Sequence, residues 1–415
     1  MKIIFALALL ASVLSGCGGN SQSLPEESNG SIETVPVSIT DYEGGFKIFT
    51  QKELVRGAYE PEYGCYTGAY ILSDKVSGGD IANFEQITGV EHGMYTYVYK
   101  MGQPFPSDWV LGCIAKMKTP NIIIVPENID NPYDTKLLEK AARQCGEFSV
   151  PVFIHFYPVD NSCGYKSEEY RAFFQIARAY FSQYANKAAF VWDIGADSMD
   201  MAESFYPGDS FVDWAGINIC MSIDYETQRL TEDIIPKLNY FYYTFQEKKP
   251  MFISQLAVSH FSSVNHAYYL NEADLAIGEI YMRTKEDFPR IKAVNYMSYN
   301  GIEPVNMNQG GDNYSVAADS RIANIYKAAV ESEYFLSTLD FTSGGENFTQ
   351  KCALPYEAIY HNDSFYADKY FMSFINGNED TGQEVTIAGN EEYYPLTGLY
   401  VNSDFKARTV EVRRN

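Results

Sequence analysis

The chain has 415 residues, of which 54 are acidic and 31 are basic, so its formal net charge is −23. An acidic surface of this kind repels nucleic acid and anionic lipid headgroups, and neither is expected as a partner. The length predicts a large core in more than one domain. The seven cysteines include no CxxC pair, so we expect no zinc site, and nothing in the sequence indicates another metal or a cofactor.

The N-terminus has the layout of a secretory signal. Lys2 precedes an apolar run, Ile3–Leu14, that is too short to span a bilayer, and two small residues lead to Cys17. Leu14-Ser15-Gly16-Cys17 resembles the bacterial lipobox, which implies removal of residues 1–16 and lipidation of Cys17. An ordinary signal peptide with an incidental cysteine is the alternative. We expect an exported lipoprotein, anchored at the bacterial cell membrane or cell surface by lipid alone.

The segment that follows, residues 17–45, is expected to be a lipidated tether. Residues 18–29 are small, polar and acidic, with nothing to bury. Cleavage removes Lys2 and no acid, which takes the net charge from −23 to −24. No later apolar run approaches ~18 residues, so no transmembrane helix is expected.

Over residues 50–335, short β-branched runs alternate with longer stretches of helical period, which is typical of βα units in a parallel sheet. The eight predicted strands are Tyr66–Leu72, Met94–Tyr99, Asn121–Val125, Val150–Phe156, Ala189–Trp192, Val212–Ile219, Pro250–Leu256 and Ala293–Tyr299. The predicted helices include Asp134–Cys145, Ser167–Tyr184, Thr231–Gln246 and Asn271–Thr284. Ser167 is expected as an N-cap. Eight such units predict an α/β fold of the (β/α)8 TIM barrel type. A doubly wound sheet is the alternative, but no Gly-rich phosphate loop follows the first strand.

Residues 340–415 change in character to Gly, Asn and Asp turns between short alternating strands, which predicts a small β domain. The predicted strands are Val385–Ile387, Tyr393–Leu396 and Thr409–Val412. The segment resembles the short β module first named from copper amine oxidases, which recurs as an accessory stalk in bacterial surface proteins. The resemblance implies no copper chemistry here.

Residues Tyr206–Trp214 read YPGDSFVDW and lead into the sixth predicted strand, with Gly216 two residues further on. This string resembles the YPGD-x-YVDW-x-G turn of glycoside hydrolase family 26. Supporting matches follow in the family's order at Gly64–Gly68, Phe105-Pro106, Phe190–Asp193 and Lys249–Met251. The resemblance implies a retaining, β-mannanase-like barrel with two catalytic Glu residues, and a polysaccharide such as a β-mannan as partner.

The same resemblance points to altered catalytic positions. Retaining hydrolysis needs two carboxyl groups about 5 to 5.5 Å apart, one as acid and one as nucleophile. His155 matches the family's motif, but Phe156 stands at the acid's position and Gln255 at the nucleophile's. Cys220 stands where the family has a Tyr that bonds to the nucleophile. Phenylalanine cannot donate a proton and an amide cannot act as the anionic nucleophile, so the ancestral chemistry is expected to be lost.

Other side chains near strand ends are candidates for chemistry or binding. Relocated acids would be Asp160, Asp193 or Glu303, with Glu127 and Asp197 as further candidates. Each also fits a solvated loop acid or a helix cap. The residues expected to bind substrate are His155, Tyr157, Trp192, Gln255, His260 and Tyr296. Ordinary packing is the alternative for the aromatic ones, and a surface position for His260.

Two functions of different classes remain open. The first is a surface lipoprotein whose barrel binds polysaccharide without cleaving it, which Phe156 and Gln255 favour. The second is an active endo-β-glycosidase with relocated carboxylates, which the barrel and the export signal favour. An importer's solute-binding component is disfavoured because the strand pattern shows no two hinged lobes. Since fold does not imply function, the site decides, and its residues favour the non-catalytic interpretation.

Overall fold

The computed structural model describes residues 56–126, 134–148, 150–157, 159, 166–231, 233–302 and 311–339, and the backbone of seven strands outside these ranges. Eight strands pair side by side in parallel, and the last pairs with the first. They are β3 (Cys65–Tyr70), β4 (Met94–Lys100), β5 (Thr119–Val125), β6 (Val152–Phe156), β7 (Ala188–Gly195), β8 (Trp214–Met221), β11 (Met251–Val258) and β14 (Ile291–Met297). The sheet is a closed (β/α)8 barrel, so the predicted fold class is confirmed.

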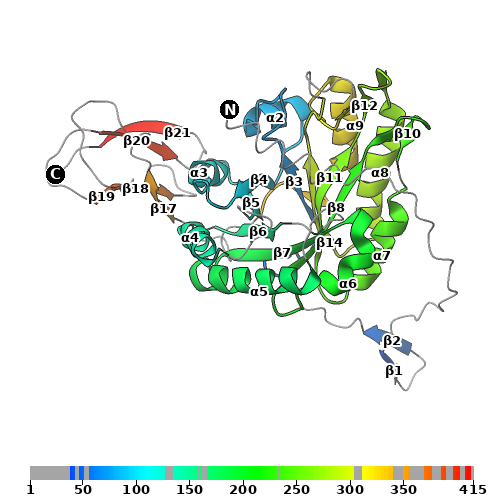
Figure 1. Ribbon diagram of the computed structural model, residues 1–415, viewed down its shortest axis with the longest axis horizontal. Helices are drawn as coiled ribbons and strands as arrows, with labels where there is room; N and C mark the ends of the chain where they lie inside the picture. Colours follow the sequence, from blue (N-terminus) through cyan, green and yellow to red (C-terminus); the bar gives the residue numbers. More distant parts are fainter. Residues whose placement is uncertain are drawn as a thin grey trace.

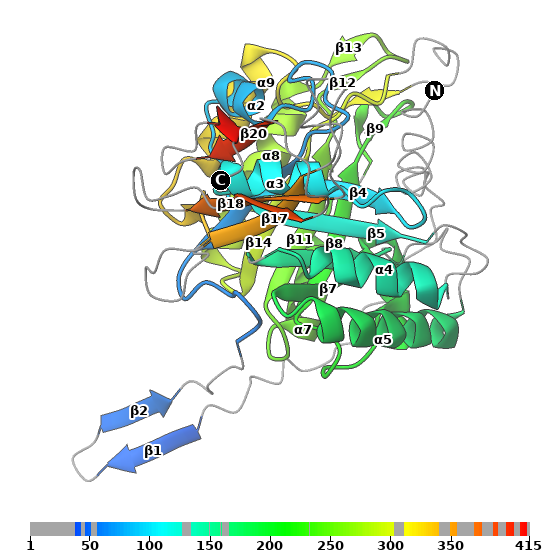
Figure 2. The ribbon, with the colours of Figure 1, turned by 90° about the vertical axis from the view of Figure 1, so that its left-hand side faces the viewer.

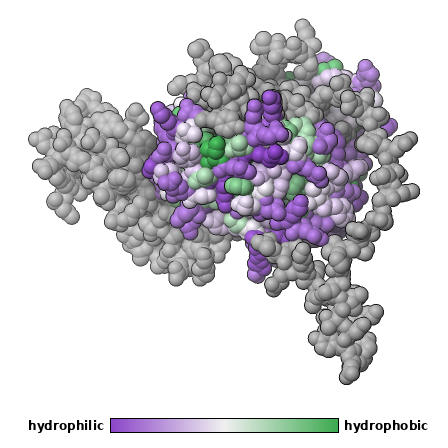
Figure 3. Space-filling model, turned by 60° about the horizontal axis from the view of Figure 1, so that its bottom comes forward, coloured by the Kyte–Doolittle hydropathy of each residue, from purple (hydrophilic) through white to green (hydrophobic). Residues whose placement is uncertain are grey.

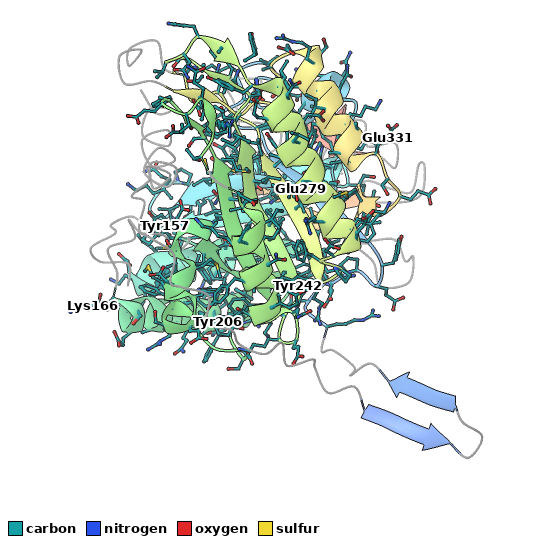
Figure 4. The ribbon with its side chains drawn as sticks, turned by 90° about the vertical axis from the view of Figure 1, so that its right-hand side faces the viewer. Tyr157, Lys166, Tyr206, Tyr242, Glu279 and Glu331 are labelled. Atoms are coloured by element: carbon teal, nitrogen blue, oxygen red, sulfur yellow. The ribbon has the colours of Figure 1, made fainter. Side chains whose placement is uncertain are left out.

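Helices cover the outside of this barrel (Figure 1). They are α2 (Ile81–Thr88), α3 (Ser107–Ala115), α4 (Thr135–Cys145), α5 (Ser167–Tyr184), α6 (Ala202–Phe205), α7 (Ile235–Phe245), α8 (Leu270–Glu286) and α9 (Ser320–Val330), with the 3-10 helix η2 (Ala196–Met201) before α6. The four predicted helices all form, as α4, α5, α7 and α8. Figure 4 looks onto α7, α8 and α9, which lie side by side over the strands.

Helix α5 begins one residue away from its expected cap. The prediction of Ser167 as the N-cap is wrong, because Ser167 is the first helical residue and Lys166 holds the extended cap position. The carboxylate of Glu169 accepts a hydrogen bond from the backbone N of Lys166 at 3.2 Å. Glu168 and Glu169 both lie in the first turn, where carboxylates interact favourably with the helix dipole.

The amino-terminal end of the barrel is packed with rings and closed by a short segment. Inside the barrel, the ring of Trp214 lies 5.4 Å from that of Phe153 and 6.1 Å from that of Phe252. The Trp214 Nε1 donates to the backbone oxygen of Ala58 at 2.7 Å, which ties residues 57–60 to this end. These contacts fill and cover the described amino-terminal end of the barrel.

The carboxyl-terminal end carries short antiparallel strands that follow the barrel strands. They are β9 (Ile223–Asp224), β10 (Arg229–Leu230), β12 (Phe261–Ser262), β13 (Ala267–Tyr268) and β15 (Asp312–Asn313). β9 pairs with β10, and β12 lies between β13 and β15 in a three-stranded sheet. They gather beyond the ends of β8 and β11, at the top of Figure 2. At the opposite end, β16 (Phe335–Leu336) pairs with the start of β3.

Strands also form outside the barrel. β1 (Ser38–Tyr42) and β2 (Phe46–Thr50) pair in a segment that includes part of the expected tether, whose composition did not indicate a hairpin. The C-terminal strands are β17 (Thr349–Leu354), β18 (Lys369–Ile375), β19 (Val385–Ala388), β20 (Leu396–Val401) and β21 (Ala407–Val412). Two predicted strands are confirmed as β19 and β21, whereas Tyr393–Leu396 overlaps β20 at Leu396 alone. Within the described residues, no helix has the length and apolar character to cross a membrane.

Candidate functional site

The carboxyl-terminal mouth of the barrel is the place where enzymes of this fold carry their reacting groups. Buried side chains form a cluster there, which we call the mouth cluster: Tyr70, Ala257, Met297, Tyr299 and Tyr314, with Val98 and Cys220 packed against it. The rings of Tyr299 and Tyr314 stack with centroids 4.8 Å apart and planes 15° apart. This part of the mouth is apolar and aromatic.

Beneath the mouth, a chain of hydrogen-bonded side chains crosses the barrel interior. His155 donates from Nδ1 to Asp193 Oδ2 at 2.6 Å, and its Nε2 lies 2.6 Å from Asn121 Oδ1. Ser254 donates to Asp193 Oδ1 at 2.5 Å. Thr96 Oγ1 accepts from Asn121 Nδ2 at 3.0 Å and from Asn295 Nδ2 at 2.9 Å. We call these six residues the polar chain: Asn295, Thr96, Asn121, His155, Asp193 and Ser254.

Two glycines make room for the polar chain on the strands that contribute no side chain to it. A Cβ on Gly68 of β3 would lie 1.6 Å from Asn295 Oδ1, and one on Gly216 of β8 would lie 1.8 Å from Asp193 Oδ1. Neither overlap is tolerable, so both positions require glycine.

Within the polar chain, both carboxylate oxygens of Asp193 are engaged in hydrogen bonds. Asp193 is 0% exposed, and each of its oxygens already accepts a hydrogen bond. A Ser-His-Asp hydrolase needs the hydroxyl to bond to the imidazole, but Ser254 donates to the carboxylate instead. Asp193, one of the predicted relocated acids, therefore has no free oxygen with which to act on a ligand.

The structure corrects one expectation about the site, namely the direction in which the Phe156 side chain faces. Side chains alternate along a strand, so with His155 inside the barrel its neighbour faces outward. The Phe156 ring lies between the sheet and α5, with its centroid within 6.1 Å of four other rings: those of Phe173, Phe174, Phe181 and Phe190. The residue predicted at the acid's position thus faces away from the mouth.

Gln255 lies inside the barrel because of an irregularity in β11. The pairing register between β11 and β8 shifts between Ile253 and Gln255. Ser254 faces inward, since it reaches Asp193, and Ala257 faces inward, since it belongs to the mouth cluster. Alternation from Ala257 puts Gln255 inward too, and a bulge is what allows two consecutive side chains on one face. Gln255 is 5% exposed.

Two predicted sugar-stacking residues pack outside the barrel instead. The Trp192 ring lies 5.1 Å from that of Tyr206, labelled in Figure 4, and 5.4 Å from that of Phe245 on α7. The Tyr296 ring lies 5.1 Å from that of Tyr326 on α9. Each is the neighbour of an inward polar residue, so alternation turns it toward the helices. The expectation that they stack on substrate is therefore wrong for this geometry.

The remaining predicted residues are buried or lie outside the described ranges. His260 is 0% exposed and its Nε2 lies 2.9 Å from the backbone oxygen of Ser315, so it is not on the surface. Burial lowers the pKa of His260 below its ordinary value. Tyr157 is 2% exposed and packs in the main core. Asp197 pairs with Lys237 at 2.6 Å. Four residues singled out from the sequence lie outside the described residues: Asp160, Glu303, Glu127 and Cys17.

Sequence reasoning missed two buried carboxylates that brace the mouth. Asp74 accepts from Ser298 Oγ at 2.5 Å and from Ser315 Oγ at 2.6 Å. Asp312 Oδ2 accepts from the backbone N of Ile223 at 2.7 Å, and burial raises the pKa of this carboxyl. Each joins loops more than 80 residues apart in sequence, a relation that no local pattern signals.

The described cysteines and acids form no metal centre. Within the ranges that the structure covers, no three His, Cys, Asp or Glu side chains come together as a metal site. The buried thiols of Cys65, Cys113 and Cys145 are free. Burial raises the pKa of Cys145 to about 12, so it behaves as a small apolar side chain.

Comparison with known proteins gives the site a family context. Residues 156–275 match the sequence profile of glycosyl hydrolase family 26. No curated protein matches this sequence. Similar solved structures include a GH26 β-mannanase from Bacteroides ovatus, at 11% identity and a TM-score of 0.48, covering 69% of this chain and 94% of that one. Another is GH26C from a Muricauda species, at 14% identity and a TM-score of 0.49, covering 66% and 87%. A third is the catalytic domain of a Bacillus GH26 endo-β-1,4-mannanase, at 13% identity and a TM-score of 0.47, covering 68% of this chain and 89% of that one.

Proposed function

We propose that this chain is an exported lipoprotein whose barrel binds a polysaccharide without cleaving it. The observation that carries the proposal is the lack of an available carboxylate at the described strand ends. None of the last two residues of the eight barrel strands is Asp or Glu. Glycosidases of both stereochemical outcomes use two carboxyl groups that flank the scissile bond.

The positions that matter most carry other chemistry. Gln255 presents a neutral amide inside the barrel, and Phe156 is buried under α5. Both carboxylate oxygens of Asp193 already accept hydrogen bonds, from His155 and Ser254. The profile match over residues 156–275 supports a carbohydrate as the ligand.

The test compares binding with turnover on the purified chain. We expect isothermal titration calorimetry to detect binding of a β-mannan or another neutral glycan, and a reducing-sugar assay to find no hydrolysis of the same glycan. Without a proton donor and a nucleophile, the rate is expected to stay near background, because proton transfer alone typically contributes ~10² to 10⁴-fold.

The same assay decides against the proposal if the glycan is cleaved. Turnover that persists after removal of contaminating enzymes, and disappears in Asp160→Ala or Glu303→Ala, would identify a relocated acid and an active endo-β-glycosidase. A chain that binds no glycan of the panel would refute the carbohydrate ligand altogether.

The lipid anchor is tested separately. Leu14-Ser15-Gly16-Cys17 supports cleavage before Cys17 and its acylation. In a bacterial host, we expect the wild type to incorporate radiolabelled palmitate and to fractionate with membranes, and Cys17→Ala to do neither. The matched control is Ser15→Ala, which keeps a small residue before the cysteine. Equal labelling of Cys17→Ala and the wild type would rule out this anchor.

A further inference from the structure

One inward-facing position at the mouth carries a buried polar atom that has no partner. In β8 every second side chain faces the barrel interior: Trp214 packs on Phe153, Gly216 lies beside Asp193, and Cys220 touches the mouth cluster. Asn218 lies between Gly216 and Cys220, so alternation turns it inward as well. Its Oδ1 is buried and has no hydrogen-bond partner among the described residues.

Asn218 itself is partly exposed, although its Oδ1 is buried. It pairs in register with Gly195 on β7 and with Gln255 on β11. Gly195, the last residue of β7, has no side chain and is half-buried, as are Asn218 and Cys220 of β8. The bulge at Ser254 turns Gln255 into the barrel at the same level. Two side-chain amides therefore stand side by side at the floor of the mouth.

We propose that Asn218 and Gln255 form a subsite that holds one sugar unit of a neutral polysaccharide by its hydroxyl groups. This inference rests on the proposed function and names the ligand's chemical class. Each amide has an acceptor oxygen and an NH₂ with two donors, whereas a carboxylate only accepts. Neighbouring sugar hydroxyls both donate and accept, so the pair fits a diol, and a ligand hydroxyl would supply the donor that Asn218 Oδ1 lacks.

Charge argues against an acidic polysaccharide in this place. The chain carries a net charge of −23, and the buried carboxylates Asp193 and Asp312 lie near the mouth. A uronic acid would meet this potential with its own negative charge. Lys100, at the end of β4, is the one cation among the last two residues of the described barrel strands.

The experiment is calorimetric titration of the purified chain with manno-, cello- and xylo-oligosaccharides, and with oligogalacturonate as the acidic counterpart. We expect a neutral oligosaccharide to bind and oligogalacturonate not to bind. Asn218→Ala should weaken the neutral ligand by about twofold to tenfold, the range of one uncharged hydrogen bond. The matched control is Asn271→Ala, on the exposed first turn of α8, which should leave the dissociation constant unchanged.

A double-mutant cycle tests whether the two amides hold the same sugar unit. We expect the loss in Asn218→Ala with Gln255→Ala to be smaller than the product of the single losses. Asn218→Leu, which is similar in size and has neither donor nor acceptor, serves if the alanine variant does not fold. Its expected loss is of the same size.

The possible results distinguish a failure of the proposed subsite from a failure of the proposed function. Binding of a neutral oligosaccharide with wild-type affinity in folded Asn218→Ala or Asn218→Leu would overturn the subsite and leave the proposed function standing. Preferential binding of oligogalacturonate would overturn the neutral class and point to Lys100. Absence of any glycan binding by the wild type would overturn both proposals.

Discussion

Burial decides what a residue can do at this site, and Asp193 is the clearest case. A carboxylate in a barrel of this kind invites a catalytic interpretation, yet Asp193 is 0% exposed and both its oxygens accept short hydrogen bonds. Buried charged groups are stable only when they are paired and hydrogen-bonded, so His155 and Ser254 are what make this aspartate tolerable in the core. Its contribution is to stability.

This interpretation predicts a measurable cost for Ser254→Ala. The substitution removes the hydroxyl that donates to Asp193 Oδ1 at 2.5 Å. A hydrogen bond to a charged group contributes about 1.5–3 kcal/mol, and we expect the free energy of unfolding to fall by that amount in urea titrations. Ser210→Ala, at an exposed turn, is the matched control and should change it by less than about 0.5 kcal/mol. A similar value for the two variants would contradict the structural role of Asp193.

The positions of the strands could be predicted from the sequence, but the direction in which each strand residue faces could not. The eight strands could be located from the sequence because parallel strands are apolar on both faces, but that same property hides which side chains face inward. His155 and Phe156 are adjacent, so one alone can face the interior, and only tertiary packing reveals which. The bulge that lets Ser254 and Gln255 share a face has no signature in the residues Ile253–Gln255.

Substitution of two glycines, one in β8 and one in α8, tests how tightly the polar chain packs against the backbone. A Cβ on Gly216 of β8 would overlap Asp193 Oδ1 and Ser254 Oγ, whereas a Cβ on Gly278 of α8 meets nothing within 4 Å. Overpacking typically costs ~1–3 kcal/mol, and an exposed helical Gly costs ~1 kcal/mol relative to Ala.

We therefore expect opposite signs: Gly216→Ala should lower the thermal midpoint and Gly278→Ala should raise it. Differential scanning calorimetry of both variants under one condition is the measurement. An unchanged or raised midpoint in Gly216→Ala would mean that the polar chain can shift to accommodate the added methyl group, contrary to the distances.

The barrel mouth is formed by contacts between residues far apart in the sequence. The order of the strands and helices could therefore be predicted, but the arrangement of the mouth could not. The order of eight βα units follows from local pattern, whereas the loops after β8, β11 and β14 meet only in three dimensions, as Asp312 and Ile223 do. Figure 3 shows one described face of the surface, which is mostly hydrophilic with small separate hydrophobic spots.

A buried histidine links the first and last helices of the barrel, and its burial is expected to make the fold sensitive to acid. His92, between α2 and β4, lies with Nε2 2.8 Å from the hydroxyl of Tyr326 on α9, 234 residues away in sequence. Burial, with a contribution from Lys118, lowers the pKa of His92 from 6.5 to about 3. The unfolded chain binds this proton below about pH 6.5 and the folded chain does not. Stability is therefore expected to fall as the pH drops from about 6.5 toward 3.

Replacing His92 by a side chain that cannot titrate should flatten this dependence. One proton bound by the unfolded state alone gives a slope of at most about 1.36 kcal/mol per pH unit. We expect His92→Gln, which keeps a polar group near Tyr326, to lose up to that slope between pH 6 and pH 4 relative to the wild type, measured by urea unfolding at each pH. His266→Gln, on an exposed turn, should keep the wild-type slope. If the two variants follow the same pH profile, His92 is not the group that couples protonation to folding.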